Sequence, residues 1–89
     1  MRRINLSRQA RKFLPTVPPK HGRQLEVKIR QLTVDPQPQD SKLLKGYDCW
    51  RTTSGEYRII YEYDDMELRV LIIGKRNDDE VYRLLRRGS

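Results

Sequence analysis

Arg58 is the residue of this 89-residue chain that most needs a chemical explanation. It lies within the run from Glu56 to Tyr63, which is rich in β-branched and aromatic residues with the period of two that predicts a strand. Because side chains alternate along a strand, Arg58 should share a face with Ile60 and Glu62. An unpaired guanidinium is costly to bury. The sequence therefore predicts either an ion pair, with Glu62, Glu56 or an acid on the next strand, or an anionic ligand.

Further cations are expected close to this strand. Lys75 and Arg76 follow the next predicted strand, and Tyr82 comes six residues after Arg76, on the first turns of a predicted helix. Arg51, on the preceding strand, can lie across the hairpin from Arg58 or near it. Like charges placed this close repel one another unless an anion lies between them. A bound phosphate would explain the cluster.

Three motifs in this region, in order along the chain, resemble the RelE/ParE superfamily of toxins. Their family patterns are K-L-x-G, then G-x-Y-R-h-h-Y, then h-G-x-R followed by a helix that ends in tyrosine. The matching segments are Leu43-Leu44-Lys45-Gly46, Gly55–Tyr61 and Gly74–Tyr82. The likeness covers nearly all of the chain by element order and is sharpest from Leu44 to Arg83. It implies a toxin of a type II toxin–antitoxin system, neutralised by a co-expressed antitoxin.

For RelE-like members, the resemblance implies ribosome-dependent cleavage of mRNA in the ribosomal A site, with a 2′-hydroxyl attacking the adjacent phosphate. By position, Arg58 would lie at the scissile phosphate and protonate or stabilise the leaving oxygen. Arg76 would hold the charge of the transition state. Tyr82 would stack on a base or orient the attacking hydroxyl, and Arg51 matches the first of two basic positions on the preceding strand.

The second basic position of the family pattern is absent from this sequence. The hairpin Thr52-Thr53-Ser54-Gly55 has threonine where a lysine is expected. Lys42, Lys45 and Lys75 are the candidates to replace it, and together with Arg83 they are the residues that we expect to bind RNA. The residue that abstracts the proton of the 2′-hydroxyl and the codon preference are left open by the sequence.

The residue types in this cluster limit the mechanism. Arginine keeps its proton above about pH 12 and the ordinary pKa of tyrosine is near 10, so neither is an ideal acid or base at neutral pH. His21 is predicted to be an ordinary surface residue at the start of a helix. Catalysis would then depend on positioning and on cations aimed at the developing charge. We therefore expect the free protein to be a poor ribonuclease that needs the ribosome to orient its substrate.

Other functions remain open at this stage. A ParE-like gyrase poison would share the fold without the nuclease cluster, and a DNA-binding or antitoxin-binding module without activity would be consistent with the charge. The presence of Arg58, Arg76 and Tyr82 favours the RelE-like alternative. No metal or cofactor is expected, because the sequence has neither a Cys/His metal spacing nor a glycine-rich phosphate loop. Cys49 is predicted to be a packed strand residue, and Trp50 to be in the core, although an exposed tryptophan would suit stacking on RNA.

The elements that position these residues follow from local patterns, and they predict a small α+β domain over residues 1–89 with the order β-α-α-β-β-β-α. The sheet should be mainly antiparallel, preceded by a helical hairpin and followed by a C-terminal helix. A short first helix should have Asn5 or Ser7 as its N-cap and end at Pro15, and its apolar residues are Leu6, Ala10, Phe13 and Leu14. A second helix should run from about Pro19 to Val34. Its inward residues should be Leu25, Ile29 and Leu32, and its outward cations should be Lys20, Arg23, Lys28 and Arg30. After the loop Asp35–Asp40, strands are expected at Cys49–Thr53, Glu56–Tyr63 and Leu68–Ile73. A final helix should follow, capped by Asn77 and with Asp78, Asp79 and Glu80 in its first turn. The segment Arg2–Leu6 could add an edge strand to the sheet.

Charge and composition suggest the partners. Nineteen lysines and arginines against 12 acids give a net charge of +7 and a pI near 9.9, and residues 1–30 alone hold nine basic residues and one acid. Such a field attracts nucleic acid, although solvated helix faces would look the same. A lone cysteine, the lack of a signal-peptide pattern and the lack of an apolar run near 20 residues predict a cytoplasmic protein with no membrane partner. The expected partners are a cognate antitoxin that brings acidic and apolar surface, mRNA in the ribosomal A site and, through the antitoxin, operator DNA.

Overall fold

A five-stranded sheet in the order β1-β5-β4-β3-β2 forms the centre of the fold. The computed structural model describes residues 1–77 and 79–88. Neighbouring strands are antiparallel except for β1, which runs parallel to β5. The elements along the chain are β1 (Arg3–Leu6), α1 (Arg8–Phe13), a 3-10 turn η1 (Leu14–Thr16), α2 (Pro19–Val34), β2 (Lys42–Leu44), β3 (Cys49–Ser54), β4 (Tyr57–Tyr63), β5 (Glu67–Lys75) and α3 (Glu80–Gly88).

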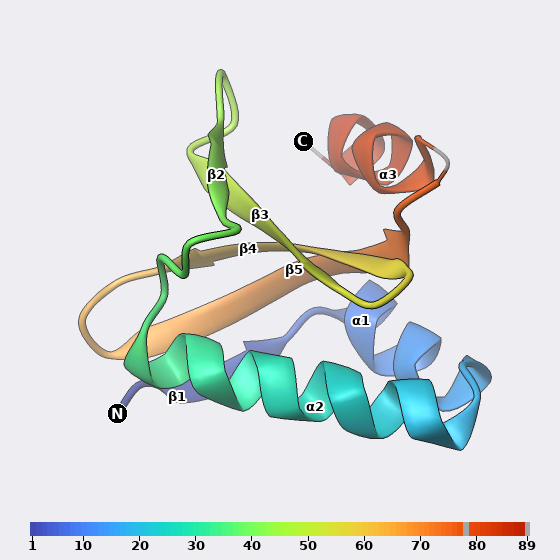
Figure 1. The fold of residues 1–89 in the computed structure, drawn as a ribbon. Helices are drawn as coiled ribbons and strands as arrows, with labels where there is room; N and C mark the ends of the chain where they lie inside the picture. Colours follow the sequence, from blue (N-terminus) through green and yellow to red (C-terminus); the bar gives the residue numbers. More distant parts are fainter. Residues whose placement is uncertain (78, 89) are drawn as a thin grey trace.

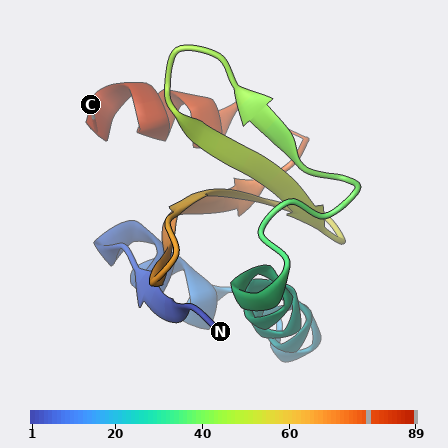
Figure 2. The ribbon, with the colours of Figure 1, turned by 90° about the vertical axis from the view of Figure 1, so that its left-hand side faces the viewer.

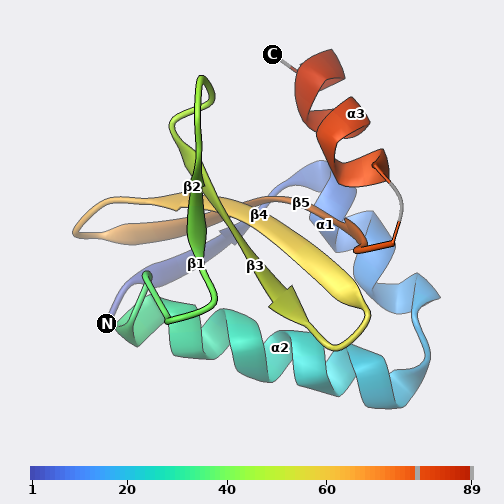
Figure 3. The ribbon, with the colours of Figure 1, turned by 45° about the horizontal axis from the view of Figure 1, so that its top comes forward.

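The helices divide unequally between the two faces of the sheet (Figure 1). Helices α1 and α2 cover one face, and α3 lies over the other face, near the end of β4 and β5. Figure 2 shows the three layers edge-on, and Figure 3 shows α3 beside the projecting β2–β3 hairpin. The α1/α2 face buries the larger core, which includes Leu25, Ile29, Leu32, Tyr57, Ile59 and Tyr61. A smaller core of Cys49, Ile60, Ile72 and Val81 lies under α3. Much of the α3 face of the sheet is therefore left to polar side chains.

The predicted fold class and most elements are confirmed. Helix α2 has the predicted bounds, because prolines and apolar spacing fix it locally and Leu25, Ile29 and Leu32 are buried as expected. The predicted alternation along β4 also holds: Tyr57, Ile59 and Tyr61 pack toward α2, whereas Ile60 packs toward α3. The three-strand meander is present with slightly different ends.

Three features differ from the predictions. The strand β2 was not predicted, and it is the fifth strand of the sheet through its pairing with β3. The chain continues past Pro15 as the turn η1, because proline is tolerated in a first helical turn. Helix α3 begins at Glu80, and the carbonyl of Asp79 accepts a hydrogen bond from the amide of Arg83 at 3.0 Å, so Asn77 is not the N-cap. The predicted first-turn residue Asp78 lies outside the described residues.

Of the two predicted caps for α1, the structure has Ser7. Its hydroxyl oxygen accepts from the amide of Ala10 at 3.1 Å, which satisfies one of the free donors of the first turn. Within residues 1–77 and 79–88, no helix is long and apolar enough to cross a membrane.

Candidate active site

Arg58 is half-buried on the face of β4 that looks toward α3. In the sheet register its neighbours are Thr53 on β3 and Gly74 on β5. Directly paired residues share a face, so Arg58, Thr53 and Gly74 form one row across the sheet. The row lies beside the smaller core and beneath the first turns of α3.

Gly74 lets α3 come close to this row. A Cβ atom at that position would lie 2.7 Å from Cγ1 of Val81, which is closer than real Cβ contacts. A glycine within a strand commonly marks such an approach of another element. The missing side chain of Gly74 therefore allows Val81 to pack on the sheet and brings the next residue, Tyr82, to Arg58.

Tyr82 holds the guanidinium of Arg58. Its hydroxyl accepts a hydrogen bond from an Nη of Arg58 at 2.9 Å, and the guanidinium carbon lies 5.4 Å from the centre of its ring. The Nε of Arg58 is buried and has no hydrogen-bond partner among the described residues. Part of the guanidinium is thus dehydrated without compensation.

The structure also bears on the ion pair that the sequence left open for Arg58. Glu62, a candidate partner on the same face, instead pairs with Arg69 at 3.3 Å. Among the side chains that the structure describes, no carboxylate forms a salt bridge with Arg58. An unpaired, half-buried cation that faces an open surface is suited to bind an anion.

Arg51 lies on the same face of the sheet as Arg58, in the next row of paired residues on that face. Its register partners are Ile60 on β4 and Lys42 on β2, so Thr53, and not Arg51, is directly across from Arg58. Arg51 is half-buried and Lys42 is exposed. The two cations extend the open polar surface from β4 to the edge of the sheet.

The other predicted site residues surround this surface unevenly. Arg76 is exposed immediately after β5, and its backbone amide donates to the carbonyl of Glu56 at 2.9 Å, which places it at the same end of the sheet as the β3–β4 turn. Arg83 is exposed on α3, and Lys45 is exposed in the turn after β2. Lys75 pairs with Tyr57, whose side chain packs toward α2, so Lys75 lies on the face opposite to Arg58.

The sequence did not predict the role of Asp40, which contacts the part of β3 that does not pair with β2. Its carboxylate accepts from the hydroxyl of Thr52 at 2.8 Å and of Thr53 at 3.3 Å, and it forms a salt bridge with Lys28 at 3.2 Å. Burial acts to raise the pKa of Asp40, but the hydrogen bonds from Thr52 and Lys28 outweigh it and hold the pKa below 3.8. A polar loop residue before a predicted strand gives no local signal of this role.

The remaining candidates do not join the site. Cys49 is a packed core residue, as predicted, and burial raises the pKa of its thiol to about 11, which keeps it protonated and unreactive. Trp50 packs against the larger core, on the face away from Arg58. The prediction for His21 is wrong: it is half-buried, and its Nδ1 lies 3.2 Å from the hydroxyl of Tyr57.

A small α+β fold with a cationic, half-covered sheet face defines the class of protein, that of the RelE/ParE toxins. The family model for the ParE toxin of the type II toxin–antitoxin system parDE matches residues 4–80. The chain therefore belongs to this family, and it is a type II toxin of the RelE/ParE superfamily. No curated protein sequence matches the chain.

Solved structures give the same fold. The archaeal RelE–RelB complex from Pyrococcus horikoshii matches with 28% identity and a TM-score of 0.73 over 84% of this chain and 94% of that chain. A mutant of the Escherichia coli toxin RelE in the free state matches with 24% identity and a TM-score of 0.79 over 98% and 96%. Escherichia coli YafQ matches with 19% identity and a TM-score of 0.68 over 86% and 96%.

Proposed function

We propose that this toxin is a ribosome-dependent mRNA endonuclease that cleaves mRNA in the ribosomal A site and so inhibits translation. The observation that supports it most is Arg58, a half-buried guanidinium with an unpaired Nε and no acidic partner among the described side chains. Burying such a group without an anion is unfavourable. A phosphate of the RNA backbone would supply the missing countercharge at the part of the guanidinium that solvent still reaches.

The reaction would proceed by attack of a ribose 2′-hydroxyl oxygen on the adjacent phosphorus. As the bond from the 2′ oxygen to phosphorus forms, the 2′-hydroxyl gives its proton to a base, the bond from phosphorus to the 5′ oxygen breaks, and the leaving oxygen takes a proton, so that a 2′,3′-cyclic phosphate and a 5′-hydroxyl result. Arg58 would lie at the scissile phosphate and stabilise or protonate the leaving oxygen. Because the hydroxyl oxygen of Tyr82 accepts from Arg58, its own proton remains available to the attacking hydroxyl or a phosphate oxygen.

Arg76 and Arg51 would approach the phosphate from two sides. Arg76 follows β5, two residues after the register partner of Arg58, and would stabilise the transition-state charge. Arg51 shares the open sheet face with Arg58. Preorganised cations of this kind typically contribute on the order of 100–1,000-fold each in rate.

We further propose that Lys42, Lys45 and Arg83 bind the RNA strand around the scissile phosphate. Lys42 extends the row of Arg51 at the sheet edge, and Arg83 lies one residue from Tyr82 on α3. Lys75 lies on the other face of β5, so it could reach only RNA that passes around the sheet end. The ribosome would hold the mRNA in the geometry that these groups require, since none of them is an ideal base at neutral pH.

We propose a cognate antitoxin as the protein partner in the cytoplasm, with operator DNA bound through that antitoxin. Solved complexes of RelE with RelB from Pyrococcus horikoshii, Escherichia coli and Mycobacterium tuberculosis support such a partner. The basic surface of the toxin would favour acidic segments of the antitoxin.

A second candidate function is that of a ParE-like poison of DNA gyrase, which the match to the ParE toxin family favours. The fold serves both alternatives equally, because a fold does not determine the target. The Arg58–Tyr82 pair favours the nuclease, since a gyrase poison has no need for a phosphate site between β4 and α3.

One experiment separates the two functions. The toxin is induced in cells, mRNA 5′ ends are mapped, and gyrase activity is measured in a supercoiling assay, with Arg58→Ala as the matched control. Codon-phased cuts that disappear in the control support the nuclease. Trapped gyrase complexes with intact mRNA would overturn it, and rapid cleavage of naked RNA would contradict the ribosome requirement.

A further inference from the structure

Tyr47 is the one exposed aromatic side chain among the described residues, and it lies in the tight turn between β2 and β3. Its relative exposure is 41%, and its amide donates to the carbonyl of Leu44 at 3.3 Å. The residues on either side, Gly46 and Asp48, have positive φ values of +86° and +52°. Such angles are uncommon for a residue other than glycine, so this turn holds the backbone of Tyr47 in a specific conformation.

Tyr47 lines a hollow of about 370 Å³ that we call the Tyr47 hollow. The apolar residues that line it from other elements are Leu84 and Leu85 of α3 and Leu71 and Ile72 of β5. Figure 3 shows that the β2–β3 hairpin and α3 both rise from the same face of the sheet. An aromatic ring and aliphatic side chains thus border one hollow from separate elements.

A β-bulge forms the floor of this hollow. Ile60 pairs with Ile72 and Tyr61 pairs with Val70, so Leu71 is the extra residue of β5. The bulge brings two consecutive side chains, Leu71 and Ile72, to the smaller core on the α3 face. Bulges re-aim side chains in this way and are common next to active sites.

The polar side chains that line the hollow are already engaged. The hydroxyl of Ser7 donates to the carbonyl of Leu71 at 2.5 Å, and the amide of Gln9 exchanges two hydrogen bonds with the backbone of Ile73 at 2.8 and 2.9 Å. These contacts hold β5 beyond the end of β1 and leave mainly apolar surface for an occupant. An occupant should therefore stack in the hollow rather than be recognised by hydrogen bonds.

Exposed cations surround the hollow. Arg8 is the first residue of α1, Lys45 belongs to the β2–β3 turn, and Arg86 and Arg87 lie in the last turn of α3. Asp48 is an acid in the same β2–β3 turn, so the cations outnumber it. An apolar hollow with an aromatic wall and a cationic rim fits a nucleobase, whose ring stacks while the neighbouring phosphates meet the cations.

We infer that the Tyr47 hollow stacks one base of the mRNA, within a few nucleotides of the scissile phosphate. The inference rests on the proposed function for the source of the RNA, and it adds a base-binding subsite to the cations around Arg58. Tyr47 lies six residues before Thr53, the register partner of Arg58, which is at most roughly 20 Å at 3.3–3.6 Å per residue. A stacked strand rises about 3.4 Å per nucleotide, so one strand can reach both places.

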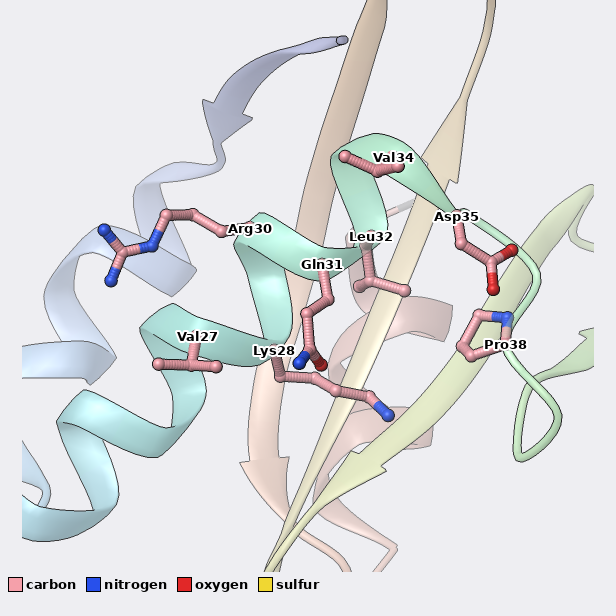
Figure 4. Close-up of a pocket in the computed structure, with 8 residues that line it drawn as sticks. All are labelled: Val27, Lys28, Arg30, Gln31, Leu32, Val34, Asp35 and Pro38. Atoms are coloured by element: carbon pink, nitrogen blue, oxygen red, sulfur yellow. The ribbon is translucent and has the colours of Figure 1, made fainter.

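Other hollows and other occupants fit less well. A hollow of about 640 Å³ beside α2 is lined by residues that include Val27, Val34 and Pro38, and none of its lining residues is aromatic (Figure 4). A second copy of the chain would add another charge of +7 beside the cationic rim. An apolar peptide side chain would fill the Tyr47 hollow without using its rim, and antitoxin binding distinguishes it from a base.

The test uses a short single-stranded RNA in which every ribose is 2′-O-methylated, so that it cannot be cleaved. The fluorescent base 2-aminopurine replaces one base at a time, and its fluorescence falls when it stacks on an aromatic ring. The purified toxin should quench the base that enters the hollow. Tyr47→Ala should remove this quenching and weaken binding by roughly 10-fold to 100-fold, the usual contribution of one stacked base, whereas Tyr47→Phe should retain both.

An abasic position in the RNA tests whether the ring and the base are partners. Removing the base that enters the hollow should weaken binding to the wild type by the same factor, and binding to Tyr47→Ala no further, because both changes remove one contact. Leu43→Ala is the matched control and should bind like the wild type. Leu43 is 55% exposed on the same hairpin, and its register partner Trp50 packs toward the opposite face of the sheet.

Tyr47→Leu tests whether the ring only packs against α3. This variant keeps an apolar side chain, so a packing role predicts wild-type affinity for the RNA, and that result would overturn the inference. We expect instead a wild-type Tm together with RNA binding that is weakened as in Tyr47→Ala.

Two further results would overturn the inference. Unchanged quenching and affinity in Tyr47→Ala would exclude the hollow as a base site, and wild-type RNA binding with lost affinity for the co-expressed antitoxin would assign it to a peptide. The uncleavable RNA separates this inference from the nuclease. Quenching that depends on Tyr47, together with intact mRNA in cells, would remove the nuclease proposal and leave the base site standing, and codon-phased cuts without such quenching would do the reverse.

Discussion

Replacing Arg58 with methionine should abolish the proposed cleavage while changing the stability of the toxin little. This combination distinguishes a residue kept for function from one kept for the fold. A methionine side chain fills similar space and packs against the ring of Tyr82. The expected loss of cleavage is on the order of 100–1,000-fold, the usual effect of removing one preorganised donor.

The effect on stability follows from the contacts of Arg58. The change removes a charge-assisted hydrogen bond to Tyr82, about 1.5–3 kcal/mol, and a cation–π contact, about 0.5–1 kcal/mol. It also removes a buried, unpaired Nε–H, whose desolvation is unfavourable by about 1–3 kcal/mol. At mid-range, about 3 kcal/mol lost against about 2 kcal/mol regained leaves a net destabilisation of about 1 kcal/mol. A buried ion pair that lost its cation would instead be destabilised by about 3–5 kcal/mol.

Thermal unfolding and ribosome-dependent cleavage of mRNA measure the two effects on the same preparation. In a domain of this size, 1 kcal/mol shifts Tm by about 4–8 °C, so the expected shift stays below about 15 °C. The matched control is Arg69→Met on the neighbouring strand. Arg69 pairs with Glu62, Asp64 and Glu67 at 3.0 to 3.3 Å, and its loss should lower Tm and leave cleavage unchanged.

Two outcomes would refute this reasoning. A fall in Tm well beyond 15 °C, roughly what the loss of a buried ion pair would give, would show that Arg58 has an anionic partner within the folded toxin. Cleavage at the wild-type rate would show that the half-buried cation on β4 does not bind the reacting phosphate.

Four further substitutions test other parts of the site. Gly74→Ala should push α3 away from β5, because the new Cβ would lie 2.7 Å from Val81, and we expect a destabilisation of about 1–3 kcal/mol in thermal unfolding together with weaker cleavage; an unchanged Tm would mean that the helix can shift freely. Asp40 has a lowered pKa, so its contribution to stability is complete at neutral pH and is lost as the pH falls below about 3.8. In Asp40→Asn, acid unfolding followed by circular dichroism should therefore depend less on pH in that range. An acid transition identical to that of the wild type would argue against the contacts of Asp40 with Thr52 and Lys28. Arg76→Ala and Tyr82→Ala should each relieve growth arrest while antitoxin binding, measured by calorimetry, stays largely intact; full toxicity of both would place the site elsewhere.

The part of the site that could be predicted from sequence depends on local periodicity. The period of two along β4 places Arg58 on the face opposite to the tyrosines because alternation is a property of every strand. The position of Thr53 directly across from Arg58 depends instead on the register of the β3–β4 hairpin, which alternation alone does not give. The structure pairs Ser54 with Tyr57, which leaves a two-residue turn with Gly55 at a φ of +59°, and only that turn places Thr53 against Arg58.

The unpredicted features depend on contacts between distant segments. Three residues, Lys42–Leu44, are too few to show alternation, and β2 exists through its pairing with β3. The packing of Val81 against Gly74 is equally nonlocal, although a glycine inside a predicted strand is a usable signal of close approach. Asp40 gives no such signal, because its role depends on where α2 and β3 lie in space.

The unequal cover of the two sheet faces explains how one small toxin can hold both an unpaired cation and a stable core. Two helices bury one face around Leu25, Ile29 and Leu32, and this core provides most of the apolar burial. The nine residues of α3 cover part of the other face, over the smaller core of Cys49, Ile60 and Ile72. Arg58 lies at the edge of that cover, where Tyr82 fixes the guanidinium but solvent still reaches part of it. A longer helix there would bury the cation completely at a cost of several kcal/mol, and without a helix the guanidinium would not be fixed. A short, closely packed α3 is therefore the arrangement that would keep the proposed anion site both rigid and open.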